Sequence, residues 1–344
     1  MIRLLALTML LWVASGCRAQ ESPPPLESQP SVDVQQLLTH RQVAAPPAVT
    51  GRQPLLWVSL AAHLGARADA APLTLKASSG SLSLEDRSGR RWSAASVQIS
   101  WRSVPLEKPL ALARRVAGPF ASFESAERVA LRWRALGVSA EVAHPADWEV
   151  WAPAGAPAPG DLPVRDWSTR LESSVEPVLQ LPEGGTTLKG PLQIDAPGGL
   201  RWGKGVFQGP FRLQRDAYGS WTLVEQVPLE RYLEGVVPHE IGAGSPQAAL
   251  QAQTVLARTW ALANSHRFRI DGYHLCSDTQ CQVYSDPRQA GQAVRQAITA
   301  TQGRLLSWQG KPISAVYHAT NGGVMAAGPE AWAMDAQPYL KAEA

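Results

Sequence analysis

Glu240 lies between an apolar run and a turn that contains glycines, in the stretch EGVVPHEIGAG. Apolar surroundings disfavour the charged form of a carboxyl group and raise its pKa. Val236, Val237, Pro238 and Ile241 can supply such surroundings. Glu240 could therefore hold a proton near neutral pH and act as a general acid. The stretch SPQAAL follows, which places Glu240 on a loop before a helix. The alternative is an acidic residue at a helix start, where the helix dipole favours it.

The helix that follows Glu240 has the clearest pattern in the chain. Residues Ser245–Ser265 are rich in alanine, with Ser245 predicted as the N-cap and Pro246 at the first helical position. A second helix is expected over Gln289–Gly303, and then a hairpin that turns at Gln309–Gly310. Short β segments separated by turns precede Glu240. We predict an α+β fold, with antiparallel-rich sheets on which the helices pack.

A further helix is predicted within residues 118–142, GPFASFESAERVALRWRALGVSAEV. Ser122 is its expected N-cap, and the apolar positions recur at helical spacing. These positions are Ala126, Val129, Ala130, Trp133 and Leu136. This strand-helix-strand segment resembles half of a SPOR domain, a module that binds bare peptidoglycan strands. The alternative is an amphipathic helix packed on a sheet.

The first 20 residues are typical of a secretory signal, with Arg3 followed by an apolar run and small residues. Their end, ASGC, resembles a bacterial lipobox, in which Cys17 would be lipidated. Ordinary signal cleavage is the alternative. Residues 21–50 are rich in proline and predict a linker. We expect export to the periplasm or cell envelope, with the membrane contacted only through a lipid anchor.

The charge of the chain is nearly balanced. It has 32 basic and 29 acidic residues among 344 and no long basic run. A basic patch is what nucleic-acid binding requires, so we expect no nucleic-acid partner.

Four motifs occur in order within residues 227–340. The first is the run from Tyr232 to Trp260 around Glu240, and the second is CSDTQCQVY. The third is YHATNGG, and the last is Trp332 with PYL. Together these motifs resemble the SpoIID/LytB family, which includes stage II sporulation protein D and amidase enhancers. The chain ends four residues after PYL, where relatives continue, so we expect the C-terminus of this domain to be incomplete.

The resemblance implies a peptidoglycan lytic transglycosylase. Such an enzyme cleaves between MurNAc and GlcNAc and leaves a 1,6-anhydro product. Glu240 is the implied catalytic residue, and no cofactor is required for catalysis. The resemblance adds candidate contacts to the glycan strand: His239, Arg258, Gln282, Tyr284, His318, Thr320, Asn321, Gly322 and Gly323. Arg258 could instead pair with a structural acid, and His239 and His318 could be solvated or structural. Ala319 and Asn321 stand where relatives carry serine.

Cys276 and Cys281 admit a structural zinc site or a disulfide. Some relatives bind zinc through these two cysteines and a histidine, which here would be His266 or His274. A disulfide across this short separation is feasible in an oxidising compartment.

Two functions remain open at this level. The first is the transglycosylase. The second is a non-catalytic glycan-binding module that enhances a partner N-acetylmuramoyl-L-alanine amidase. We divide the chain into an N-terminal α/β region with the SPOR-like half at residues 51–165 and a SpoIID-like domain at residues 166–344.

Overall fold

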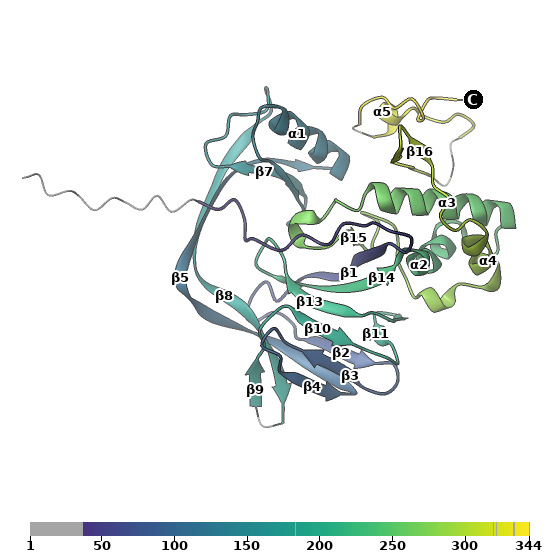
Figure 1. Ribbon diagram of the computed structural model, residues 1–344. Coiled ribbons are helices and arrows are strands. Elements are labelled where there is room, and N and C mark those ends of the chain that lie inside the picture. Colours follow the sequence, from purple (N-terminus) through teal and green to yellow (C-terminus); the bar gives the residue numbers. More distant parts are fainter. Residues whose placement is uncertain (1–36, 183, 319, 321, 333, 344) are drawn as a thin grey trace, which may run out of the picture. The chain divides into compact units, whose positions relative to one another are not determined.

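The computed structural model describes residues 37–182, 184–318, 320, 322–332 and 334–343. They form an α+β fold, as predicted (Figure 1). Among these residues, no helix has both the length and the apolar character needed to cross a membrane. The predicted signal and Cys17 lie outside the described residues.

The first sheet joins strands from distant parts of the sequence in the order β15-β1-β14-β13-β10-β3-β4. Its pairs are antiparallel except for β1 with β15. In β10, Leu192 and Ile194 are buried and Gln193 between them is exposed, as expected when one face of a strand packs on the core. The strands are β1 (Leu55–Leu64), β3 (Leu82–Glu85), β4 (Arg91–Ala94), β10 (Leu192–Asp195), β13 (Phe211–Arg215), β14 (Trp221–Pro228) and β15 (Leu275–Cys276).

The second sheet is built around a long antiparallel pair, β5 with β8. Its order is β12-β11-β2-β5-β7-β6, and β8 also pairs with β9. Its strands are β2 (Leu73–Ala77), β5 (Ser96–Phe120), β6 (Glu141–Ala143), β7 (Trp148–Pro153), β8 (Val164–Leu181), β9 (Gly184–Thr187), β11 (Leu200–Trp202) and β12 (Gly205–Phe207).

The predicted division at residues 165 and 166 falls inside β8 and does not separate two domains. Strands from before and after it alternate in both sheets, for example β1 between β15 and β14, and β3 beside β10. The described chain forms one compact unit from Leu37 onward. The division was wrong because turn-rich composition marks loops, whereas strand pairing is set by contacts distant in sequence.

Three helices pack together, and the first of them contacts β1 and β14 (Figure 1). They are α2 (Leu229–Ile241), α3 (Gln247–Ala263) and α4 (Gln292–Ala300). Val236, Leu250 and Val294 carry their apolar faces into the main core. Because each helix buries one face against the others, and α2 also contacts the sheet, the ends of α2 and α3 are held in fixed positions.

The boundaries of the predicted helices need correction. The cap residue of α3 is Pro246, with no side-chain cap, because the hydroxyl of Ser245 donates to the carbonyl of Ile241 instead. The second predicted helix is shorter and is preceded by a 3-10 turn. The remaining short elements are η1 (Arg269–Asp271), η2 (Pro287–Gln289), β16 (Ser307–Trp308), β17 (Lys311–Pro312) and α5 (Gly328–Ala331).

The predicted hairpin is confirmed. β16 pairs with β17, and Gln309 and Gly310 between them have φ of 48° and 75°. Positive φ at both central residues is what a type I′ turn requires.

Helix α1 (Phe123–Ala135) confirms the pattern predicted in residues 118–142, and it lies with β5 and β7 (Figure 1). The hydroxyl of Ser122 accepts a hydrogen bond from the N–H of Ser125 at 3.2 Å and so caps the helix. Trp133 is fully buried, whereas Leu136 is exposed, so that residue was wrongly assigned to the core face.

The described part of the predicted linker does not behave as a free tether. The carbonyl of Leu38 accepts from the N–H of Ala113 at 2.9 Å, and the carbonyl of Thr39 accepts from Arg114 at 3.1 Å. The carbonyl of Pro47 lies 2.8 Å from a ring nitrogen of His274. Residues 37–50 therefore pack against the folded unit, because their backbone groups find partners there.

Candidate functional site

Glu240 lies in the last turn of α2, not on a loop before a helix. The apolar residues before it belong to this helix, and Val236 and Val237 are fully buried. Gly242, with φ of 82°, ends the helix. The alternative of an acid favoured by a helix start is excluded, because a negative charge at a helix C-terminus gains no such stabilisation.

The carboxyl group of Glu240 is half-buried, and this burial raises its pKa above the usual value. Three weaker influences act the other way: a hydrogen bond from the phenol of Tyr317, one from the N–H of Val283, and the nearby charge of His239. The net direction is upward. A raised pKa lets a carboxyl group donate a proton at a pH where an ordinary glutamate is ionised.

A chain of hydrogen bonds supports the partner of Glu240. The phenol of the fully buried Tyr232 donates to Oε1 of Gln282 at 3.2 Å, and Nε2 of Gln282 donates to the phenol oxygen of Tyr317 at 3.0 Å. Tyr317 then donates to Glu240. Since Gln282 occupies the acceptor side of Tyr317, the phenol proton is directed toward the carboxylate.

Two predicted glycan contacts are corrected by the same cluster. Gln282 and Tyr284 are buried, with 2% and 5% of their surface exposed. The ring of Tyr284 stacks on Tyr232 at 5.0 Å, and its phenol donates to buried Glu225 at 2.9 Å. Both residues therefore act behind the site, where a substrate cannot reach them.

A cavity of about 360 Å³ opens beside Glu240. Segments distant in sequence line it: the start of α1, α3 and the residues after it, the loop at 279–283, and residues 316, 317 and 332. The lining residues are Ser122, Phe123, Glu124, Glu240, Trp260, Arg267, Thr279, Gln280, Cys281, Val283, Val316, Tyr317 and Trp332. The lining combines aromatic and aliphatic side chains with charged and polar ones, and a concave site of this kind can bind a ligand that has both apolar surface and hydrogen-bonding groups.

Arg258 is not available to Glu240 or to a substrate. Only 1% of its side chain is exposed, and its guanidinium forms two hydrogen bonds with Glu230, at 2.8 and 2.7 Å. The alternative of a structural ion pair is therefore the correct one. It joins the first turn of α2 to the middle of α3.

The remaining predicted contacts lie at the surface. His239, next to Glu240, is exposed, as are His318, Thr320, Gly322 and Gly323. None of these described residues lines the cavity, although Val316 and Tyr317, just before them, do. Asn321 lies outside the described residues.

Cys276 and Cys281 form a disulfide. The N–H of Trp57 donates to Nδ1 of His274 at 2.8 Å, and the other ring nitrogen faces Pro47, so His274 has no free nitrogen for a metal. His266 contacts Glu127 at 2.8 Å. No group of three metal-ligating side chains occurs in the part of the chain that is described. The predicted zinc site is therefore not supported by these residues, and the disulfide alternative is.

Several residues of the cavity were missed from the sequence. Tyr317 stands inside the quoted motif YHATNGG but was passed over for the residues that follow it. Trp260 ends the first motif, around Glu240, but it was not proposed as a contact. Glu124 and Arg267 carried no sign of proximity to Glu240, because they reach the cavity only through the packing of α1 against the end of α3. Val283 acts through its backbone, which no side-chain pattern reveals.

Comparison with known proteins finds relatives of the region that contains Glu240. Residues 217–308, which include α2, α3 and the disulfide, match the family model SpoIID, described as stage II sporulation protein. Stage II sporulation protein D of Bacillus amyloliquefaciens is 37% identical over 134 residues, which are 34% of this chain and 38% of that protein. The amidase enhancer of Bacillus subtilis (strain 168) is 35% identical over 111 residues, which are 32% of this chain and 15% of that protein.

Through this region the chain is similar to the SpoIID/LytB family, as its motifs predicted, and the match covers less than half of the chain. Stage II sporulation protein D of Bacillus subtilis (strain 168) is also similar, at 33% identity over 133 residues. The chain spans less than half the length of these curated relatives. The family supports a role connected with the cell wall.

Proposed function

We propose that this protein is a peptidoglycan lytic transglycosylase, with Glu240 as its catalytic acid and base. Protonated Glu240 donates its proton to the glycosidic oxygen between MurNAc and GlcNAc, and the bond to the anomeric carbon breaks. The 6-hydroxyl of the same MurNAc forms the new bond to that carbon, and the Glu240 carboxylate takes its proton. The products are a 1,6-anhydro end and a GlcNAc hydroxyl, so no water is consumed.

The observation that carries this proposal is the position of Glu240. It is a half-buried carboxyl group with a raised pKa that faces a cavity, in the region that matches the family model. One carboxyl group is sufficient for this reaction, because the attacking hydroxyl belongs to the substrate and is already close to the reacting carbon.

The residues around Glu240 would tune its two roles. Burial favours the protonated form needed for the first step. The hydrogen bonds from Tyr317 and Val283 then stabilise the carboxylate that forms when the proton has left. Because both donors are held in place before the reaction, they need little reorganisation during it.

A second candidate is a glycan-binding protein that stimulates an amidase without cleaving the strand. The printed name of the Bacillus subtilis relative, amidase enhancer, favours it. The cavity beside Glu240 would then bind glycan, and the partner would be an N-acetylmuramoyl-L-alanine amidase. The two candidates differ in whether anhydro ends appear without an amidase.

Digestion of purified sacculi tests the choice. We expect wild-type protein to release muropeptides with 1,6-anhydro ends and the Glu240→Gln variant to release none while still binding. Release of reducing ends instead would indicate hydrolysis. Binding with no release by either protein, together with faster cleavage by an added amidase, would favour the enhancer.

Two further parts of the proposal concern location. Export to the periplasm or cell envelope is supported by the signal-like first 20 residues and by the disulfide, which persists in oxidising compartments. Lipidation of Cys17 would tether the protein to the membrane, and lipid analysis of the purified protein tests it. A Cys17→Ser variant should then leave the membrane fraction.

A further inference from the structure

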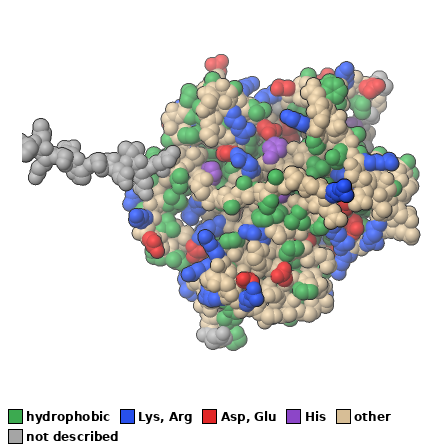
Figure 2. All heavy atoms as spheres, in the orientation of Figure 1, with side chains coloured by type: hydrophobic (Ala, Val, Ile, Leu, Met, Phe, Trp, Pro, Cys, Tyr) green, Lys and Arg blue, Asp and Glu red, His purple; other side chains and the backbone are tan. Residues whose placement is uncertain are grey.

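The cavity beside Glu240 continues along α1. A second cavity of about 300 Å³ shares Phe123 and Glu124 with the first and extends between α1 and residues 312–337. Its lining includes Leu131, whose surface is 55% exposed. On the face drawn in Figure 2, side chains of both charge signs are interspersed with hydrophobic ones. The two cavities together extend beyond the immediate surroundings of Glu240, and their walls are both polar and apolar. Such walls suit an amphipathic polymer such as a glycan strand, whose sugar rings have apolar faces and hydroxyl groups at their edges.

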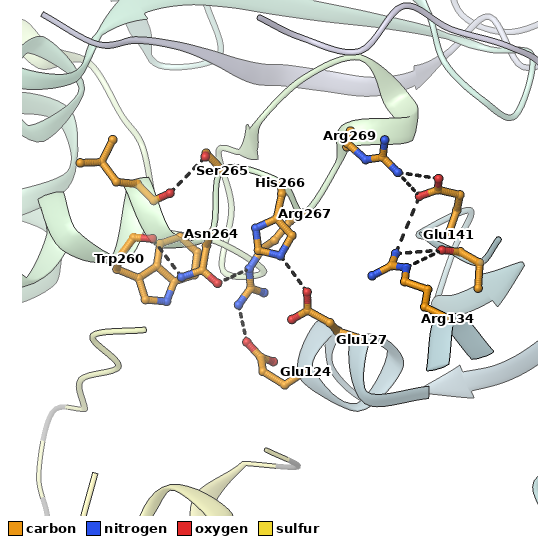
Figure 3. Close-up of polar contacts among 12 residues, drawn as sticks. Glu124, Glu127, Arg134, Glu141, Trp260, Asn264, Ser265, His266, Arg267 and Arg269 are labelled. Atoms are coloured by element: carbon orange, nitrogen blue, oxygen red, sulfur yellow. Dashed lines mark hydrogen bonds and ion pairs between the residues drawn. The ribbon is translucent and has the colours of Figure 1, made fainter. Parts of the chain in front are cut away.

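Acidic side chains of α1 and of β6, which follows it, contact basic side chains at residues 266–269 beside the site (Figure 3). Glu124 pairs with Arg267, Glu127 lies 2.8 Å from Nε2 of His266, and Glu141 of β6 accepts from Arg269 at 2.6 Å. In each pair the acid comes from the α1 region and the base from residues 266–269. These contacts fix the first turn of α1 as one wall of the cavity.

Arg267 is the most enclosed of these bases, with 5% of its side chain exposed. Its guanidinium lies between the rings of Phe123 and Trp260, at 4.5 and 4.8 Å from their centres. Its Nε donates to Asn264 at 3.1 Å, and a second nitrogen donates to Glu124. A guanidinium fixed on so many sides can hold its carboxylate partner in one orientation.

Glu124 stands where the two cavities meet. Its Oε1 accepts from Arg267, and for its Oε2 the described part of the chain offers no hydrogen-bond donor. A carboxylate held by arginine on one oxygen can accept a charge-assisted hydrogen bond from a sugar hydroxyl on the other. Exposed Leu131 on one side and half-buried Trp332 on the other provide apolar surface for the faces of sugar rings.

We propose that Glu124 is a glycan-binding residue, positioned by Arg267, and that α1 forms the wall along which the strand leaves Glu240. The substrate class is a peptidoglycan glycan strand, so the inference rests on the proposed function. Under this inference, the α1 region forms part of the groove that binds the substrate. Glu124 is a binding residue and performs no step of the reaction.

The test measures binding of soluble glycan strands, freed of stem peptides, in the Glu240→Gln background. The variants are Glu124→Gln, Arg267→Met and the two combined. Either single change leaves a buried partner without its counterpart and should lower the melting temperature. The double change removes both charges together and should recover stability. We expect the double variant to bind about tenfold more weakly despite that recovery, since one charge-assisted hydrogen bond is lost.

The matched control is Glu141→Gln with Arg269→Met, a pair of the same kind that does not line the cavity beside Glu240. It should leave strand binding unchanged. If the double variant at Glu124 and Arg267 recovers stability and affinity together, the pair is only structural and the inference fails. It also fails if Glu124→Gln, in otherwise wild-type protein, abolishes cleavage without weakening binding, because Glu124 would then be catalytic. Cleavage by the wild type separately tests the proposed function.

Discussion

Removing Glu230 is expected to destabilise the protein more than removing its partner Arg258, although both changes break the same ion pair. The pair joins the first turn of α2, the helix that carries Glu240, to the middle of α3. Its two side chains differ in exposure: 1% for Arg258 and 29% for Glu230. That difference decides which charge can be hydrated when its partner is lost.

In Glu230→Ala, the Arg258 guanidinium stays buried with weaker acceptors. They are the hydroxyl of Thr301 at 3.5 Å and the carbonyl of Arg304 at 3.3 Å. An uncompensated buried charge costs about 3–5 kcal/mol. In Arg258→Met, the remaining carboxylate of Glu230 can reach water and the methionine fills much of the vacated space, so we expect about 1–2 kcal/mol. The double variant should resemble Arg258→Met.

Urea unfolding of the two single variants and the double variant measures these differences as a double-mutant cycle. A cost for Arg258→Met equal to or above that of Glu230→Ala would refute the reasoning from burial. Strand binding in the Glu240→Gln background provides the functional check. Loss of binding in a folded Arg258→Met variant, with binding kept in Glu230→Ala, would restore the substrate role that the structure argues against.

Three further predictions concern groups near the site or deep in the core. Tyr317→Phe removes a hydrogen bond that favours ionised Glu240, so the pKa of Glu240 should rise further and the alkaline loss of cleavage should move to higher pH. A pH–rate profile measures it, and no movement would count against the contact. Burial, then the neighbouring Asp216 charge, raises the pKa of Asp271 to about 8 from 3.8. The stabilisation linked to its proton is full below pH 3.8 and lost as pH rises through 8, so Asp271→Asn should flatten the fall in unfolding free energy between those values. An unchanged slope in urea titrations would exclude Asp271 as the source. Replacing Cys276 and Cys281 together by serine opens a short loop and should lower the unfolding free energy by about 2 kcal/mol. If a chelator lowered the unfolding free energy of the wild-type protein by a similar amount, Cys276 and Cys281 would bind zinc instead of forming a disulfide.

Local sequence patterns predicted the parts of the fold that depend on neighbouring residues. The spacing of apolar residues and the cap at Ser122 predicted α1, and Gln309–Gly310 predicted a two-residue turn. Local patterns gave wrong predictions where the burial of a side chain depends on contacts with residues distant in sequence. Leu136 fits the apolar spacing of α1, yet it is exposed because no other element covers that position.

The predictions for the candidate site also divide into those that local motifs could make and those that depend on tertiary packing. The family motif identified Glu240, although its location at the end of α2 was not predicted. The same motifs suggested Arg258, Gln282 and Tyr284 as glycan contacts, and packing buries all three. Residue type and order carry no information about which side of a helix or loop will face a cavity.

The sequence by itself determined the class of fold, the similarity to the SpoIID/LytB family, and the acid on which the proposed chemistry depends, because short runs of adjacent residues carry these features. Only the tertiary structure decided that residues 51–165 share their sheets with the later chain. It alone brought Glu124 and Tyr317 to the cavity of Glu240. The physical reason is that strand pairing, burial and the resulting pKa shifts arise from contacts between residues far apart in the chain, which local periodicity does not encode.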